Sequence, residues 1–269
     1  MAIPRNSAPS LPVLATVRDA FRLLWALRDD FLRLATIPVA LTLLVNLLGF
    51  GMGAAAPGSF QSFLLSVPVI LLTTLFSVGW LRVLLLPEDR TRRDFGLRWT
   101  RRHTQFLWRS LVLVLGALLV LMIAEVLGMG VERAAPGDEP AGVIAILPVG
   151  LATLAAAYVA LRLSLVFPAA AIDHEYGFAR SWRDTRHCGV ALTVVSAILV
   201  GLSLLAANIV GLVAAVSGFQ SLAPMTTMLV LCVIEYLLTA TSLAALSIAF
   251  QRFSGWAGGA ADHPAGGQP

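Results

Sequence analysis

Six long apolar segments constrain this chain more than any other feature of its sequence. Helices need roughly 20 apolar residues to cross a bilayer core. Only 13% of the residues are charged and 58% are hydrophobic, whereas about 25% are charged in an ordinary soluble domain. The sequence therefore predicts an all-α, polytopic transmembrane bundle of six helices within residues 13–253. The predicted spans cover about 33–53, 62–86, 110–130, 143–167, 189–214 and 225–250.

The basic residues predict the orientation of these spans. All 19 of them are arginine. The connecting segments 54–61 and 215–224 carry no charge, and 131–142 carries a single arginine, Arg133. Nearly all other arginines lie on the opposite side, and positive residues are enriched in cytoplasmic loops. We therefore expect a bacterial inner-membrane protein with both termini in the cytoplasm. Its ends, 1–12 and 254–269, are predicted to be disordered.

A weak internal repeat follows from the order of the spans. The predicted inward-to-outward helices start near 33, 110 and 189, and each would follow an amphipathic helix on the cytoplasmic side. Three parallel-repeated hairpins would result. The equivalent positions would be Phe21/Trp25/Arg28, Phe95/Trp99/Arg102 and Phe178/Trp182/Arg186. The alternative is that any helix beside the cytoplasmic interface favours tryptophan and arginine.

The stretch from Leu161 to Arg186 organises the chain. A long apolar segment ends in Leu161-Arg162 and Phe167-Pro168-Ala169-Ala170, and Ser181-Trp182-Arg183-Asp184-Thr185-Arg186 precedes the next one. This pattern resembles uncharacterised bacterial six-helix inner-membrane proteins akin to the membrane domain attached to some glycerophosphodiester phosphodiesterases. The resemblance implies a membrane domain and no known catalytic residue. The family usually continues with glycine and an aromatic residue, where this chain has His187-Cys188-Gly189.

Exposed arginines and tryptophans of the cytoplasmic loops are the candidate lipid-binding residues. Each arginine near an anionic leaflet contributes on the order of 1 kcal/mol of attraction, and tryptophan anchors at the head-group level. We expect membrane lipids with anionic head groups, and a membrane-protein partner, rather than nucleic acid. A generic anchor for the loops is the competing interpretation. The candidates are Arg98, Trp99, Arg101, Arg102, Trp182, Arg183 and Arg186. Arg82 and Arg162, near the cytoplasmic ends of their spans, are expected to extend to the interface.

Three polar residues fall inside predicted spans, namely Asn46, Glu125 and Glu235. A carboxylate at that depth needs a proton, a partner or water. One interpretation is hydrogen bonding between helices of the bundle. The other is a path for protons or ions.

Catalytic patterns are absent from the sequence. There is no Gly-x-Ser-x-Gly elbow, no His-Glu-x-x-His and no phosphate-binding glycine loop. Cys188 and Cys232 belong to no metal-binding pattern and are expected to be buried apolar fillers. We therefore expect no enzyme activity, cofactor or metal. The favoured function is a lipid- or partner-interacting role in membrane and envelope homeostasis, and the alternative is a small transporter or channel that uses the intramembrane carboxylates.

Overall fold

The computed structural model describes residues 11–51, 60–87, 98–134, 141–216 and 224–256, and helices make up almost all of these ranges. The predicted disordered ends lie almost entirely outside the described residues. In chain order the helices are α1 (Val13–Ala26), α2 (Arg28–Gly51), α3 (Phe60–Leu85), α4 (Arg101–Ala134), α5 (Ala141–Leu163), α6 (Val166–Ala171), α7 (Phe178–Asp184), α8 (Gly189–Val216) and α10 (Pro224–Phe253).

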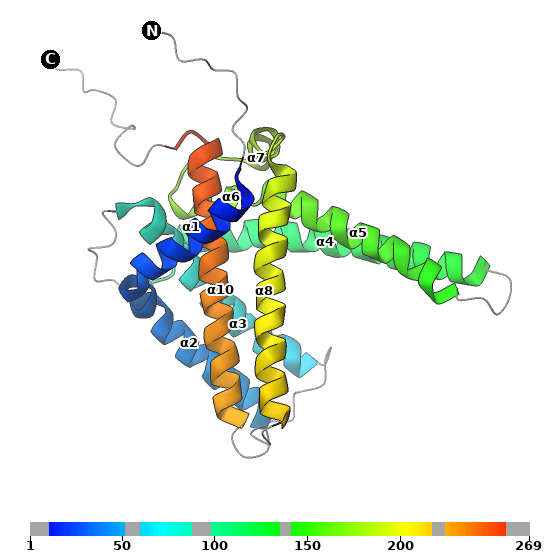
Figure 1. Ribbon diagram of the computed structural model, residues 1–269, viewed down its shortest axis with the longest axis horizontal. Helices are drawn as coiled ribbons and strands as arrows, with labels where there is room; N and C mark the ends of the chain where they lie inside the picture. The colour runs from blue at the N-terminus through cyan, green and yellow to red at the C-terminus, as the bar shows by residue number, and fades with distance from the viewer. Residues whose placement is uncertain (1–10, 52–59, 88–97, 135–140, 217–223, 257–269) are drawn as a thin grey trace, which may run out of the picture.

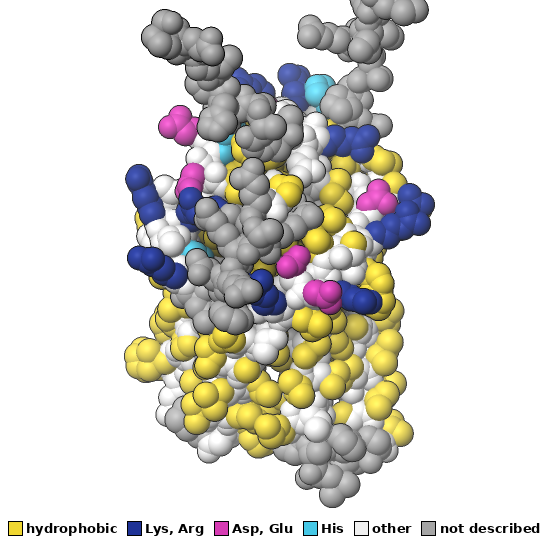
Figure 2. Space-filling view, turned by 90° about the vertical axis from the view of Figure 1, so that its left-hand side faces the viewer, with side chains coloured by type: hydrophobic (Ala, Val, Ile, Leu, Met, Phe, Trp, Pro, Cys, Tyr) yellow, Lys and Arg dark blue, Asp and Glu magenta, His cyan; other side chains and the backbone are white. Residues whose placement is uncertain are grey.

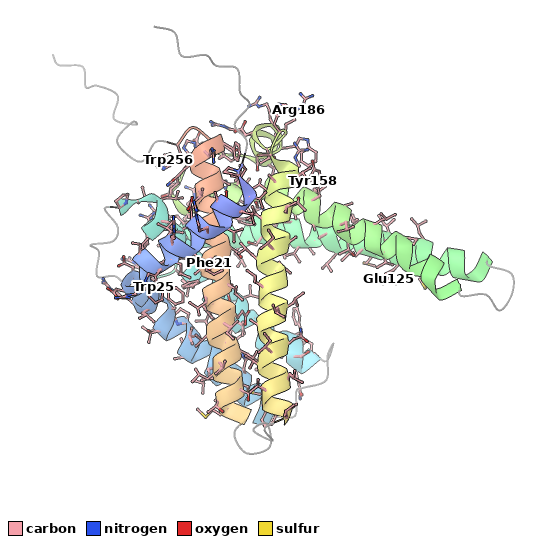
Figure 3. The ribbon with its side chains drawn as sticks, viewed as in Figure 1. Phe21, Trp25, Glu125, Tyr158, Arg186 and Trp256 are labelled. Carbon is pink, nitrogen blue, oxygen red and sulfur yellow. The ribbon has the colours of Figure 1, made fainter. Side chains whose placement is uncertain are left out.

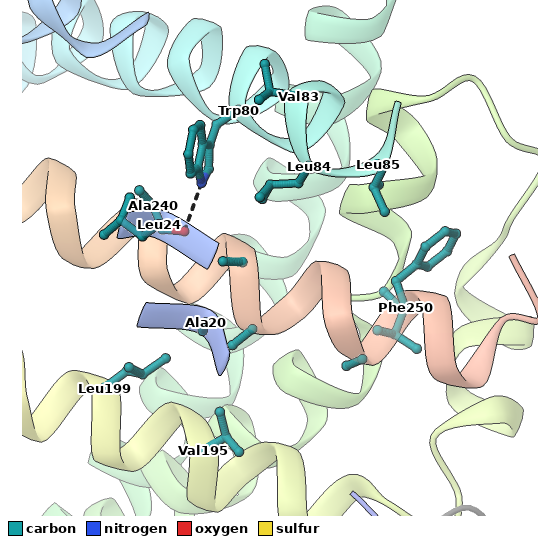
Figure 4. Packing of buried hydrophobic residues seen from close by; sticks show 14 of the residues in the cluster. Ala20, Leu24, Trp80, Val83, Leu84, Leu85, Val195, Leu199, Ala240 and Phe250 are labelled. Carbon is teal, nitrogen blue, oxygen red and sulfur yellow. Dashed lines mark hydrogen bonds between the residues drawn. The ribbon is translucent and has the colours of Figure 1, made fainter. Parts of the chain in front are cut away.

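The centre of the molecule is a bundle around α10. Helix α8 runs beside α10, and α2 and α3 also pack on α10 (Figure 1). Aromatic rings fill the contact: Phe76 meets Tyr236 edge-on with ring centres 5.1 Å apart. The indole N–H of Trp80 donates to the carbonyl oxygen of Ala240 at 2.9 Å (Figure 4). This bond satisfies the polar end of a fully buried tryptophan, which would otherwise oppose its burial.

Among the described residues, five helices are long and apolar enough to cross a membrane: α2, α3, α4 over Arg101–Leu127, α8, and α10 over Met225–Phe253. They indicate a multi-pass membrane protein. The expected span 143–167 falls on α5, but α5 ends at Leu163 rather than at Phe167, and a sixth membrane-spanning helix stays a prediction. The expected span 110–130 is the central part of the longer α4.

The N-terminal amphipathic helix differs from expectation. The apolar spacing predicts one helix over Val13–Phe31, but the structure ends α1 at Ala26 and begins α2 at Arg28. Helix α1 buries Thr16, Ala20 and Leu24, and it packs on α10 and α8. Phe21 and Trp25, predicted for the apolar face that meets the membrane interface, are exposed on the surface of the chain, Trp25 by 72%, and the interfacial position of α1 stays a prediction. Ala20 is fully buried, and its small side chain lets the backbone of α1 approach its neighbours closely.

Helices α4 and α5 form a hairpin that projects from the bundle, and we call this hairpin the arm (Figure 1). Its axis runs at a steep angle to α8 and α10 (Figure 1). Charged side chains gather towards one end of the molecule, and hydrophobic side chains cover the other half (Figure 2). The face shown is therefore divided as a membrane protein requires, with one polar end and one apolar half (Figure 2).

Candidate functional site

The candidate site is built around a break between α5 and α6. The proline ring of Pro168 would clash, in a continuous helix, with the carbonyl group four residues earlier, and proline removes one backbone donor. That carbonyl group belongs to Ser164, and α5 ends one residue earlier at Leu163. Ser164 and Leu165 form a turn, after which α6 runs from Val166 to Ala171. A helix that stops inside the protein leaves backbone carbonyl groups that need donors.

Ser181 of α7, together with Thr185 at the C-cap of α7, binds one of these carbonyl groups. Ser181 and Thr185 lie four residues apart and therefore on one face of the helical turn. The hydroxyl of Ser181 donates to the carbonyl oxygen of Arg162 at 2.7 Å, and that of Thr185 is 3.2 Å from the same oxygen. Both side chains are completely buried. Ser181 is therefore an internal link between α5 and α7, whereas Gly177 occupies the N-cap position of α7.

The side chain of Arg162 binds back to α7. Its guanidinium donates to the carbonyl oxygen of Trp182 and, through Nε, to the hydroxyl of Thr185 at 3.3 Å. The guanidinium carbon lies 3.6 Å from the ring centre of Trp182 and 5.7 Å from that of Tyr158. Only 7% of the residue is exposed. The expectation that Arg162 extends to the membrane interface is therefore wrong, because its donors are used within the protein.

Gly189 gives Arg162 the space it occupies. A Cβ atom at Gly189 would lie 3.0 Å from Cδ of Arg162 and 3.0 Å from the hydroxyl oxygen of Tyr158. Real Cβ atoms rarely come this close to a neighbour. Glycine at the first position of α8 therefore allows α8 to approach the end of α5 closely.

Three further arginines bind α6 and the residues after it. Arg109 of α4 donates to the carbonyl oxygen of Val166 at 2.6 Å, and Arg82 of α3 donates to that of Ala171 at 3.1 Å. Arg102 forms an ion pair with Asp173, which has a left-handed backbone (φ 57°) just beyond α6. Guanidinium groups carry five fixed donors and suit this role. We call Arg82, Arg102, Arg109 and Arg162 the arginine clamp.

A tyrosine and a carboxylate stabilise the loop between α6 and α7. The hydroxyl of Tyr176 donates to Oδ2 of Asp184 at 2.9 Å, and Arg180 lies 3.6 Å from the same oxygen. Burial raises the pKa of Tyr176 above its ordinary value, and the hydrogen bond to Asp184 and the charge of that carboxylate raise it further. Asp184 also forms ion pairs with Arg180 and, at 4.0 Å from its Nε atom, with Arg183.

Most of the predicted lipid-binding residues are exposed. Arg98, Trp99, Arg101, Trp182, Arg183 and Arg186 are on the surface, and Arg186 is at the polar end of the molecule (Figure 3). Arg102 is the exception, because it is half-buried in its pair with Asp173. We call Arg98, Arg101, Arg183 and Arg186 the exposed arginine face.

The tryptophans of the predicted repeat have three different environments. Trp25 lies 5.4 Å from the guanidinium of Arg28. Trp99 donates to the hydroxyl of Thr104 at 2.9 Å, and Trp182 stacks on Arg162. Phe95 lies outside the described residues. The repeat stays a prediction.

The three intramembrane polar residues are not brought together in the core. Asn46, Glu125 and Glu235 are all exposed, on α2, α4 and α10. Glu125 is on the arm, away from the bundle (Figure 3). Neither carboxylate has a hydrogen-bond or ion-pair partner within the described part of the chain. Hydrogen bonding of Glu235 to a neighbouring helix of the same copy is therefore not seen.

The chemistry of the site is that of a structural clamp. Burial raises the pKa of the Cys188 thiol to about 11, so the thiol is protonated at neutral pH and is a poor nucleophile. Across the described ranges, no three His, Cys, Asp or Glu side chains are grouped as a metal site.

Sequence reasoning missed the clamp, although one signal for it was present. The four-residue spacing of Ser181 and Thr185 places two hydroxyl groups on one face of a short helix, next to a segment that proline interrupts. Such a face is suited to binding a free carbonyl group. No comparable local pattern marks Arg109, whose partner lies 57 residues away.

Comparison of the chain with protein families, with curated proteins and with solved structures finds no match.

Proposed function

We propose that this chain is a non-enzymatic, multi-pass protein of a bacterial inner membrane whose exposed arginine face binds anionic lipid head groups, in a role in membrane homeostasis. The observation that supports it is the placement of the exposed arginines. They are exposed, as are Trp99 and Trp182, and one face of the molecule shows charged side chains gathered towards one end with hydrophobic side chains over the other half (Figure 2). Guanidinium groups form strong hydrogen bonds with phosphate, and tryptophan favours the head-group level.

The arginines of the exposed face are not part of the clamp, so their guanidinium groups are available to lipid. The clamp arginines donate to backbone carbonyl groups or to Asp173, whereas Arg98, Arg101 and Arg186 have no ion-pair partner within the described residues. A phosphate can therefore bind them without breaking an internal contact. Asn46, Glu125 and Glu235 lie exposed on separate helices, which gives no support to the transporter alternative.

The lipid proposal is tested by co-purification of lipids. Protein reconstituted into liposomes of phosphatidylglycerol and phosphatidylcholine is extracted in mild detergent, and the bound lipids are counted by mass spectrometry. Replacing Arg98, Arg101 and Arg186 with glutamine should reduce the phosphatidylglycerol enrichment several-fold, at about 1 kcal/mol per arginine. The difference should shrink at high salt, because exposed charges are screened over roughly 8–10 Å.

A matched control removes the same charge from arginines that already have partners. Arg18, Arg22 and Arg28 lie within 4 Å of Asp19 or Asp29, at 3.5, 3.9 and 3.7 Å. Their replacement with glutamine should reduce the enrichment less. Equal enrichment in wild type and in the variant of the exposed face would reject the proposal.

The proposed orientation places both termini in the cytoplasm, with three hairpins that enter the membrane from that side. Reporter fusions after residues 57, 137 and 219 should report the periplasm, and fusions after 95, 177 and 258 the cytoplasm. The fusion after residue 137 tests the arm, because a cytoplasmic signal there would show that the arm returns without crossing the membrane.

A further inference from the structure

Helix α4 begins with a reciprocal cap. Thr100 directly precedes α4, and its carbonyl oxygen accepts from the backbone N–H groups of His103 at 3.0 Å and Thr104 at 3.4 Å, as that of an N-cap residue does. In return, the backbone N–H of Thr100 donates to Nδ1 of His103 at 3.0 Å, and the hydroxyl oxygen of Thr100 lies 2.9 Å from the same nitrogen. This is the arrangement of a capping box, with histidine in the place usual for glutamate or glutamine.

The cap orders the backbone that carries part of the exposed arginine face. His103 is buried, with 6% of the residue exposed, and its ring centre lies 5.4 Å from that of Trp99. The indole N–H of Trp99 also donates to the hydroxyl of Thr104 at 2.9 Å, so Trp99 is fixed beside the first turn of α4. Arg98 and Arg101 flank Trp99 and Thr100 in the chain. The positions of these two arginines therefore depend on the cap.

Histidine makes this cap sensitive to protons. Nδ1 of an imidazole accepts hydrogen bonds only when the ring is neutral, because both nitrogens are donors in the charged form. A protonated His103 would turn a donor towards the N–H of Thr100. It would also add a positive charge to a ring on which the charges of Arg82 and Arg102 already act. A glutamine at the same position would undergo no such change.

The other elements at the base of the arm contribute few charges. Helix α6 carries no charged residue, and Asp173 just beyond it is paired with Arg102. The only charged side chain of α5 is that of Arg162, which donates to the carbonyl oxygen of Trp182. Within the described part of the chain, the charges that face His103 are thus those of Arg82 and of the Arg102–Asp173 pair.

We propose that His103 is a pH-sensitive positioning residue of the exposed arginine face: its neutral ring caps α4 and fixes Arg98, Trp99 and Arg101, and its protonation in acid releases them. This inference rests on the proposed function, because it assigns a regulation to the same lipid-binding face. Side chains that are already ordered bind at a lower entropic cost than mobile ones. Anionic lipid should therefore bind more tightly at neutral pH than in acid.

The cap itself is tested without lipid, by hydrogen exchange of the full chain in mild detergent. Protection of the amides at residues 98–104, corrected for the intrinsic pH dependence of exchange, should fall about fivefold between about pH 8 and about pH 5, as expected for loss of a typical cap. His103→Gln keeps an acceptor at this position, so its protection should not change with pH. His103→Ala should have low protection at both pH values. Protection of the wild type that does not change with pH would overturn the proposal.

The effect on lipid is tested by the phosphatidylglycerol enrichment of protein extracted from liposomes, at the same two pH values. Enrichment of the wild type should fall about two- to threefold in acid, although an added positive charge alone would attract anionic lipid. Enrichment of His103→Gln should not fall. His187→Gln is the matched control, because His187 is exposed next to Arg186 and is not part of the cap. This variant should retain the pH dependence of the wild type.

The outcomes separate this inference from the proposed function. A wild type without enrichment at about pH 8 rejects both. Enrichment that is present at that pH and does not fall in acid rejects the role of His103 and leaves the lipid-binding face intact. An equal fall in wild type and in His103→Gln also rejects that role, and assigns the pH dependence to another group, such as the Arg102–Asp173 pair.

Discussion

The arginine clamp and the exposed arginine face have the same side chain and opposite uses. Arg162 is 7% exposed and binds the backbone of α7, whereas the side chain of Arg183, on α7 itself, is 78% exposed. The difference lies in the nearby backbone. Arg162 lies within reach of the carbonyl oxygen of Trp182 and the hydroxyl of Thr185 at the end of α7, while the side chain of Arg183 on the same short helix is exposed. Arg162 is buried because the folded chain supplies acceptors for its guanidinium.

The comparison also separates folding from function. Clamp arginines fix how α3, α4, α5 and α7 meet, so their loss should destabilise the fold. Arginines of the exposed face contact little within the described residues, so their loss should leave the fold unchanged and affect lipid binding alone.

The largest expected effect is at Arg162. Arg162→Ala leaves the carbonyl oxygen of Trp182 without its charged donor and removes the stacking on the Trp182 ring. We expect the free energy of unfolding in detergent micelles to fall by about 2–4 kcal/mol, measured by denaturant titration. Arg162→Lys should recover only part of the loss, because lysine lacks the planar group that stacks and donates in two directions. A change below about 0.5 kcal/mol for Arg162→Ala would contradict the clamp.

Next in size is an alkaline loss of stability from Cys188. The folded-state pKa of about 11 exceeds the ordinary value of 9.0, so above pH 9 the unfolded chain releases a proton that the folded protein retains. This contribution is complete below pH 9 and is lost as pH rises towards 11, by at most about 2–3 kcal/mol. Cys188→Ser should remove it. Both the wild-type protein and the Cys188→Ser variant carry Tyr176→Phe in this measurement. The raised pKa of Tyr176 would otherwise also lower the stability at alkaline pH.

A smaller effect is expected from a methyl group beside the clamp. Gly189→Ala places a carbon 3.0 Å from Arg162 and Tyr158, and overpacking of this kind should cost about 1–2 kcal/mol. A Cβ atom at Gly201, on the same helix, would have no neighbour within 4 Å. Gly201→Ala should therefore stabilise the helix by about 0.5–1 kcal/mol. Thermal unfolding should show shifts of opposite sign, and equal shifts would contradict the close packing at Gly189.

The smallest effect is expected at the exposed face. Arg183→Gln and Arg186→Gln should each change the free energy of unfolding by less than about 0.5 kcal/mol, because exposed ion pairs contribute little. Denaturant titration alongside Arg162→Ala measures the contrast. Losses comparable to that of Arg162→Ala would remove the distinction between the two sets of arginines.

The sequence by itself determined the helical, membrane-spanning character of this protein. Apolar segments long enough for a bilayer admit few other solutions, since every backbone polar group in lipid must be bonded within the segment. The exposed positions of Arg98, Arg101, Arg183 and Arg186 also followed from their place in polar segments. Pro168 indicated an interruption of the helix, although the break lies before it, at Ser164 and Leu165, and Pro168 itself is within α6.

Tertiary structure alone decided which arginines are internal and which surfaces are left open. Arg82, Arg109 and Arg162 find acceptors 89, 57 and 20 residues away, and local pattern carries no information about such distant carbonyl groups. The same holds for α1, whose buried face is set by what α10 and α8 present to Ala20 rather than by its largest apolar residues. The sequence around Glu125 and Glu235 does not distinguish them from residues that pack between helices. Only the tertiary structure shows that both side chains are exposed.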